Sequence, residues 1–201
     1  MSAPQLRVLS TLASLLLGSV AAAAPQDFVI DPAHTYATFE VSHLGVSTQR
    51  GRLGNAVGTA VLDGVQGTGE ITITLDARSL STGSELMEKL LKGSSWFAVA
   101  QHPSVIFSGT SIAFVAQKPT RIDGVLTLRG VTRPISLTVT HYACTRLPFG
   151  VRLTCGMDAQ GVIRRSDFGM DSLLAFVGDE VKLLIQAEAV RQEPASVEPR
   201  P

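Results

Sequence analysis

The 201-residue sequence is poor in the motifs that most often signal catalysis or metal binding. Its four histidines, His34, His43, His102 and His141, lack the close spacing of a metal-binding helix or loop. It has no Gly-x-Ser-x-Gly motif, and its two cysteines lack the Cys-x-x-Cys spacing of a redox pair. These absences predict a protein that holds no metal and is not an enzyme.

The sequence also lacks an excess of charge and a long apolar segment in its body. Lys plus Arg and Asp plus Glu number 17 each, so the charge does not favour a nucleic acid or an anionic membrane surface as the main partner. Beyond the N-terminal region, no stretch of about 18 uninterrupted apolar residues predicts a membrane-spanning helix. We therefore expect a water-soluble domain and no nucleic-acid partner.

Both ends of the chain differ from the body. Arg7 precedes an apolar run from Val8 to Val20, and four alanines follow, which is the pattern of a secretory signal peptide over residues 1–23. Such a leader directs the protein to the periplasm. Residues 24–191 have the length of one domain with a sizeable core. Residues 192–201 are rich in proline and charge, which predicts a disordered tail.

Cys144 and Cys155 are predicted to form a disulfide, because an exported chain meets an oxidising compartment. They bracket a predicted hairpin tip at residues 147–150, and closing this short loop would contribute about 3 kcal/mol on the chain-entropy model. The two cysteines alternate with opposite faces of their strands. A β-bulge near the hairpin end would bring both onto one face.

Alternation of apolar and polar residues predicts strands along most of the domain. The clearest example is the hairpin from Leu126 to Val139, whose turn is expected at residues 130–134 with Pro134 opening the returning strand. His43 and His141 each extend an apolar face and are expected in the interior. Further strands are predicted at 36–43, 55–62, 71–75, 105–115, 151–163 and 181–190. Strands of this length and number favour closure into a barrel, which removes exposed edges.

One segment has helical spacing instead. Thr82 and Glu85 are placed as a capping box, Leu86 to Leu91 follow with period 3.6, and Gly93 can end the helix. Further short helical turns are expected at 96–99 and 172–176. Two interpretations of this apolar helical insert stay open: a plug that completes the core, and a lid over an apolar cavity. Small residues at Ala37, Ala187 and Ala189 favour room inside.

Several motifs in this order closely resemble the YceI-like family of bacterial periplasmic proteins, and the match covers nearly all of the mature domain. They are Ile30–His34, Ser42–Gly45 with Gly51, Asp76–Gly83, His102–Ser108, Gly124–Leu137, Arg165–Met170 and Gly178–Val181. The resemblance departs at Lys89-Leu90 and at Ser95–Ala98, where the family often has a His-Leu pair and an Asp-Phe-Phe-Asp-like stretch. The cysteine pair is not a general family feature.

The resemblance implies an all-β fold, an extended antiparallel lipocalin-like β-barrel of about eight strands with short helical inserts at the mouth. It also implies a long apolar tunnel that binds a polyprenol, an isoprenoid quinone or a related amphipathic lipid, with no catalytic residue and no cofactor other than a bound lipid. The residues expected to contact the ligand are Phe39, Val41, His43, Ile73, Leu86, Leu90, Trp96, Phe97, Phe107, Leu126, Leu128 and Phe168.

Two other functions stay open on the sequence alone. In the first, the barrel is an enzyme that acts on a bound lipid or quinone, with His43 as acid or base, since burial tunes the basicity of histidine. In the second, side chains fill the barrel and its outer surface contacts a partner such as a membrane protein. A homodimer is a further open alternative.

Overall fold

Nine antiparallel strands form a closed barrel in the computed structural model, which describes residues 25–146 and 152–193. The predicted signal peptide and residues 194–201 of the predicted tail lie outside these ranges. The strands are β1 (Gln26–Ile30), β2 (Tyr36–His43), β3 (Ser47–Asp63), β4 (Thr68–Ser81), β5 (Ser104–Val115), β6 (Lys118–Leu128), β7 (Val131–Arg146), β8 (Leu153–Arg164) and β9 (Val177–Arg191). A short helix, α1 (Glu85–Leu91), and a 3-10 turn, η1 (Arg165–Phe168), interrupt them.

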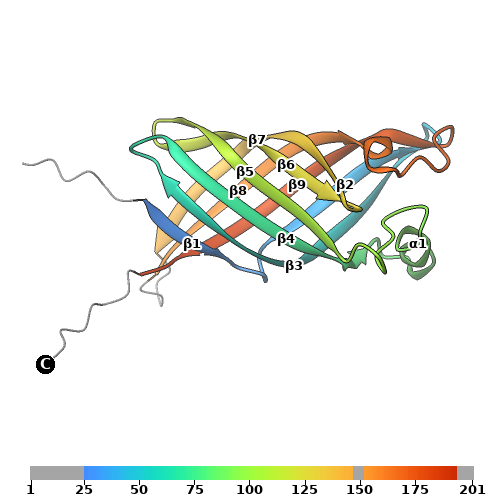
Figure 1. Cartoon of the computed structure of the whole chain (residues 1–201), viewed down its shortest axis with the longest axis horizontal. Helices are drawn as coiled ribbons and strands as arrows, with labels where there is room; N and C mark the ends of the chain where they lie inside the picture. Colours follow the sequence, from blue (N-terminus) through green and yellow to red (C-terminus); the bar gives the residue numbers. More distant parts are fainter. Residues whose placement is uncertain (1–24, 147–151, 194–201) are drawn as a thin grey trace, which may run out of the picture.

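The nine strands occupy eight positions around the ring. Figure 1 shows the barrel from the side. The ring runs from β3 through β4 to β9 in chain order, then through β2 back to β3. Strands β1 and β2 both pair with β3 and β9. They lie one after the other in the same position of the ring, β2 toward one end of the barrel and β1 toward the other. The predicted eight-position antiparallel barrel is therefore confirmed, with one position divided between β1 and β2.

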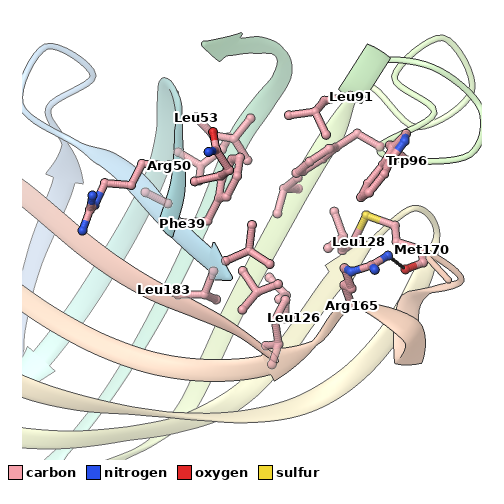
Figure 2. A pocket seen from close by; sticks show the side chains of 18 of the residues that line it. Phe39, Arg50, Leu53, Leu91, Trp96, Leu126, Leu128, Arg165, Met170 and Leu183 are labelled. Atoms are coloured by element: carbon pink, nitrogen blue, oxygen red, sulfur yellow. Dashed lines mark hydrogen bonds between the residues drawn. The ribbon is translucent and has the colours of Figure 1, made fainter. Parts of the chain in front are cut away.

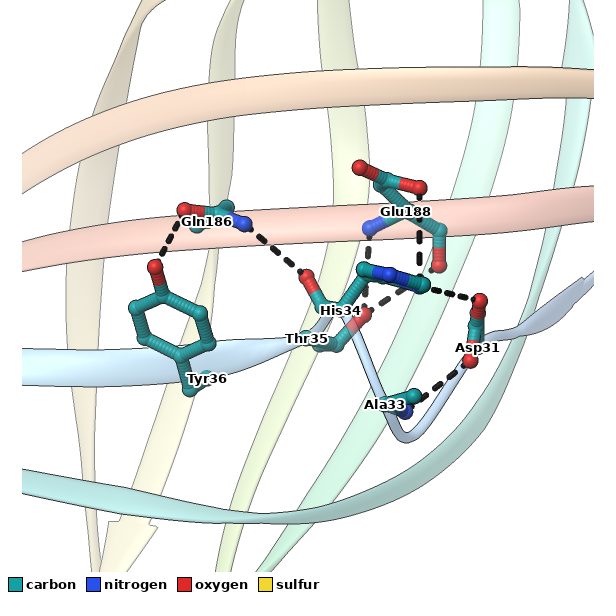
Figure 3. Close-up of polar contacts among 7 residues, drawn as sticks. All are labelled: Asp31, Ala33, His34, Thr35, Tyr36, Gln186 and Glu188. Atoms are coloured by element: carbon teal, nitrogen blue, oxygen red, sulfur yellow. Dashed lines mark hydrogen bonds and ion pairs between the residues drawn. The ribbon is translucent and has the colours of Figure 1, made fainter.

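The break between β1 and β2 is held by polar contacts to β9 (Figure 3). Thr35 is 1% exposed, and its hydroxyl donates to the backbone carbonyl of Glu188 and accepts from the backbone N–H of Glu188. Asp31 accepts the Ala33 N–H, and its other carboxylate oxygen lies 2.7 Å from His34 Nδ1. The interrupted backbone thus keeps its hydrogen-bonding groups satisfied where the ladder stops.

The β6–β7 hairpin confirms the predicted alternation but not the predicted turn. Arg129 and Gly130 have φ of 52° and 73°, the two positive values that a two-residue type I′ hairpin needs. Pro134 consequently lies inside β7, opposite Val125, rather than at the start of the strand. The proline is tolerated there because the register of β7 with β8 begins only at Thr138, so no ladder bond to β8 is lost.

A register shift in β7 between Val139 and His141 explains the cysteine pair. The bulge turns Cys144 to the same side as Cys155, and the predicted disulfide is present with the two residues directly opposite each other. The bulge lies further from the end of β7 than we expected, and the predicted hairpin tip at residues 147–150 lies outside the described residues. The same shift places His141 on the exposed outer face, which corrects its predicted interior position.

The helix is shorter and capped differently from the prediction. Ser84 rather than Thr82 is the N-cap, and its hydroxyl accepts from the Met87 N–H. Glu88 rather than Glu85 reaches back, accepting from the backbone N–H groups of Thr82 and Gly83. The segments 96–99 and 172–176 form hydrogen-bonded turns, not helices. Among the described residues, no helix is long and apolar enough to cross a membrane.

Candidate functional site

An elongated apolar cavity of about 240 Å³ lies inside the barrel. Its walls come from strands on all sides, including Leu53 of β3, Leu126 of β6 and Leu183 of β9, whose side chains converge on a common space in Figure 2. For comparison, an apolar cavity of about 150 Å³ stays dry and admits benzene. The interior therefore has room for a ligand, and we call this space the tunnel.

Most residues that the sequence pointed to line the tunnel. Those that do are Phe39, Val41, His43, Ile73, Leu90, Trp96, Phe97, Phe107, Leu126 and Leu128. Two do not. Leu86 is 82% exposed, because it lies on the face of α1 that points to solvent. Phe168 is 2% exposed but lines a separate pocket beside Arg133 and Pro134, because its segment is a 3-10 turn and not a strand that alternates inward.

One end of the barrel, which we call the mouth, carries α1, the β2–β3 turn and the 165–177 segment (Figure 1). Helix α1 has no buried residue, yet its Met87, Leu90 and Leu91 line the tunnel. The segment that follows brings Trp96 and Phe97 over the opening, and the Phe97 ring centroid lies 5.9 Å from that of Phe39. The insert covers a cavity instead of filling it, which favours the lid over the plug.

Trp96 is largely buried and is held by contacts on both its ring and its backbone. It is 8% exposed, and the Arg165 guanidinium carbon lies 5.1 Å from its ring centroid, within the range of a cation–π contact. Its backbone N–H donates to the Gly93 carbonyl. An apolar face of this ring borders the tunnel, so ligand entry would be felt by its fluorescence.

Arg165 is the main tunnel residue that the sequence did not single out by its chemistry. It is 2% exposed, and it donates to the carbonyls of Met170, Ser172, Val177 and Gly178. Burial lowers its pKa, while the nearby carboxylates of Asp179 and Asp171 oppose that shift. Hydrogen bonds within the described residues use four of its five donors, which leaves one for a ligand. The only sequence signal was its place in the Arg165–Met170 motif.

The other polar residues of the tunnel wall are Thr35, Tyr36, His43, Gln49, Arg50 and Thr82. Thr35 and Tyr36 are already engaged, since the Tyr36 hydroxyl donates to Gln186 Oε1. His43 and Gln49 lie beside the β2–β3 turn, at the mouth. The tunnel therefore combines an apolar shaft with polar groups near its opening.

Phe39 sits directly on Gly51, its cross-strand partner in β3. A Cβ added to Gly51 would lie 2.6 Å from Phe39 Cε1 and closer still to Cζ, so the ring occupies the place of that missing atom. Only glycine permits this approach. The pairing lays the phenyl ring against the wall and keeps it from projecting further into the tunnel.

The tunnel ends in a layer of buried isoleucines. Ile30, Ile71 and Ile122 are 4%, 7% and 2% exposed and line a separate void of about 40 Å³ toward the other end of the barrel. Beyond it, a wider but more polar depression of about 530 Å³ is lined by Asp63, Lys118 and the disulfide. Its polar lining fits an apolar ligand less well than the tunnel does.

One group of three potential metal ligands is found among the described residues: Asp31, His34 and Glu188, whose ligand atoms lie within 4.8 Å of one another. The hydrogen bond to Asp31 and the charge of Glu188 raise the pKa of His34, and the same hydrogen bond lowers the pKa of Asp31. A cation would have to break that 2.7 Å contact. The observed role of the group is to join β1 and β2 to β9.

Comparison with known proteins places this geometry among related barrels. The pattern of the YceI-like domain matches residues 28–189. The chain is 30% identical over 189 residues to a UPF0312 protein of Azotobacter vinelandii, covering 90% of this chain and 98% of that one. It is 31% identical over 186 residues to Protein YceI of Salmonella arizonae, covering 91% and 96%.

Solved structures agree on the fold. A crystal structure of Burkholderia cenocepacia BcnA superposes with a TM-score of 0.65 at 20% identity, covering 79% of this chain and 98% of that one. A polyisoprenoid binding domain from Saccharophagus degradans superposes with a TM-score of 0.59 at 16% identity, covering 82% and 98%. Both are barrels of the same architecture.

Proposed function

The chain belongs to the YceI-like family, and from this premise we propose that it binds an isoprenoid lipid, a polyprenol or an isoprenoid quinone, and serves as its periplasmic carrier or reservoir. The observation that carries the proposal is the tunnel, an apolar shaft of about 240 Å³ with polar groups near one end. The Saccharophagus degradans domain, described as polyisoprenoid binding, supports the choice of ligand class.

The energetics favour a long chain of branched apolar units. Burying the five carbons of one isoprene unit gains about 3 to 4 kcal/mol at ~0.8 kcal/mol per CH₂. Association costs about 4 to 15 kcal/mol in lost freedom, so several units must enter the tunnel before binding is firm. Burial of the chain against the aliphatic wall can supply this binding free energy without a charged group on the protein.

The head group of the lipid belongs at the mouth. His43 and Gln49 line that end, and Arg165 keeps one donor for an oxygen of a quinone or a phosphate. A head group left there spares its polar atoms the cost of entering the apolar shaft.

A periplasmic setting agrees with the Cys144–Cys155 disulfide, which is stable in oxidising compartments. It also agrees with the leader predicted over residues 1–23. N-terminal sequencing of the protein exported by its native host would test the setting, because cleavage near Ala23 is expected.

The binding proposal is tested by adding a long-chain polyprenol or an isoprenoid quinone to delipidated protein and measuring co-eluting lipid by mass spectrometry. Leu126→Trp fills the tunnel from β6, whereas Val125→Trp places the same ring on the outer face of that strand, where Val125 is 41% exposed. We expect uptake by the wild type and the Val125 variant and a loss of about tenfold or more in the Leu126 variant. No uptake by the wild type, or equal uptake by two folded variants, would contradict the proposal.

The enzymatic alternative is separated from binding by His43→Gln. A carrier in which His43 only borders the head group should keep most of its lipid uptake in this variant, with bound lipid chemically unchanged in both proteins. Conversion of the bound lipid by the wild type, lost in the variant, would favour the enzyme.

A further inference from the structure

Among the described residues, the exposed large apolar side chains differ in type between the mouth and the rest of the barrel. Away from the mouth they are all valines on the wall or at the far turns, such as Val57, Val65 and Val115. Every exposed leucine and phenylalanine lies at the mouth instead, and we call these residues the apolar rim: Leu44, Leu86, Leu90, Leu173, Leu174 and Phe176.

The apolar rim comes from three segments that lie together at one end of the barrel (Figure 1). The backbone N–H of Leu44, in the β2–β3 turn, donates to the Phe176 carbonyl over 2.7 Å. Arg129 joins the other two segments, since its guanidinium donates to the carbonyls of Ser94, just after α1, and Gly169. Hydrogen bonds thus join the three segments that carry the rim, although its residues are far apart in sequence.

Two rim residues occupy backbone positions that do not suit them. Leu44 and Leu173 both have φ of 56°, in the left-handed region that glycine and asparagine adopt at least cost. Both side chains are 56% exposed, but Leu173 borders the tunnel and Leu44 does not, so neither the local backbone nor the core explains a leucine at position 44. A function outside the barrel explains Leu44 better than folding does.

We propose that the apolar rim docks on the surface of a phospholipid bilayer, so that the mouth of the tunnel meets the membrane from which its lipid is taken. The inference rests on the proposed function, because the water-insoluble cargo must come from a bilayer. Leucine and phenylalanine that protrude beside an opening can enter the boundary between head groups and acyl chains. A single lipid then slides into the tunnel without crossing water.

Charges around the rim fit such a surface. Lys89 is exposed on α1 beside Leu86 and Leu90, and it can reach lipid phosphates while its apolar stem stays at the interface. The carboxylate of Glu88 is turned toward backbone N–H groups that precede the helix. Because Glu85 and Asp171 are also nearby, we expect apolar insertion to dominate and anionic lipid to strengthen docking only modestly.

The experiment is flotation of the delipidated mature protein with vesicles of phosphatidylethanolamine and phosphatidylglycerol. The rim variant combines Leu86→Ser, Leu174→Ser and Phe176→Ser, none of which lines the tunnel. The control combines Val57→Ser, Val65→Ser and Val115→Ser, which removes valines of similar exposure away from the mouth. We expect the wild type and the control to float and the rim variant to lose at least about tenfold in vesicle binding.

Docking is overturned if the wild type does not float or if the control loses as much as the rim variant. Uptake of a polyprenol dispersed in detergent is measured in parallel and should be the same in all three proteins. A wild type that takes up polyprenol but does not float refutes docking alone, whereas absence of uptake by the wild type refutes the proposed function. A wild type that stays off vesicles and dimerises through the rim would show a self-association surface instead.

Discussion

Adding one methyl group to Gly51 should push the Phe39 ring into the tunnel. The new Cβ would lie 2.6 Å from Phe39 Cε1 and closer still to Cζ, whereas ordinary contacts begin near 3.4 Å, so the ring must move by more than 0.8 Å. The backbone of β3 blocks retreat behind the ring, and the open side is the tunnel that Phe39 lines. We expect Gly51→Ala to lower the free energy of unfolding by about 1 to 3 kcal/mol through overpacking. Lipid uptake should weaken about tenfold.

Two controls isolate the contact. Gly54→Ala lies on the same strand and its Cβ meets nothing within 4 Å, so it should leave uptake unchanged. In a Phe39→Leu background, Gly51→Ala should be neutral or slightly stabilising, because the ring is gone and alanine restricts the unfolded chain more than glycine does. Urea unfolding of the wild type, Gly51→Ala, Phe39→Leu and the double variant gives the coupling energy between the two residues, expected at about 0.5 to 3 kcal/mol. Lipid uptake is measured on the same four proteins. Full uptake and full stability in Gly51→Ala alone would refute the reasoning.

Three further outcomes are expected. Ile122→Ala should cost about 2 to 5 kcal/mol of stability and let the tunnel retain a longer chain, as read by mass spectrometry; unchanged chain length would show that this layer is not the floor. Replacing Cys144 and Cys155 by serine should lower the free energy of unfolding by about 3 kcal/mol, and reductant should reproduce the loss in the wild type but not in the variant. The raised pKa of His34 gives stability that is present below its ordinary 6.5 and lost as pH rises through the raised value, and the lowered pKa of Asp31 gives stability that is present above 3.8 and lost on further acidification. His34→Gln should therefore destabilise most between these values, and a deficit in urea midpoint that is independent of pH would contradict the assignment.

The alternation of apolar and polar residues predicted most of the fold, because successive side chains of a half-buried strand point to opposite faces of the sheet. In the strand predicted at 36–43, Ala37, Phe39, Val41 and His43 occupy alternate positions, and all four line the tunnel. The errors arose where one local event shifts the period. A single bulge near residue 140 turned His141 outward, and a two-residue turn moved Pro134 into the strand.

The tunnel was less predictable from sequence where its residues lie outside strands. Leu86 and Phe168 were expected to contact the ligand, but Leu86 lies on the solvent face of α1 and Phe168 lies in the 3-10 turn η1, away from the tunnel. Arg165 shows the opposite error: it lines the tunnel but was not expected to, because an arginine is usually exposed unless buried partners such as these carbonyls surround it. The 169–178 segment supplies those carbonyl partners, and nothing in its composition predicts that its backbone surrounds the Arg165 guanidinium.

The measurement that tests the central claim most directly is organic extraction of the protein purified from its native host, followed by mass spectrometry of the extract. The account predicts a lipid with a chain of repeated five-carbon units, recovered from the wild type and depleted from Leu126→Trp. An extract that contains no such lipid, together with no uptake of added polyprenol or quinone by the delipidated protein, would contradict the account.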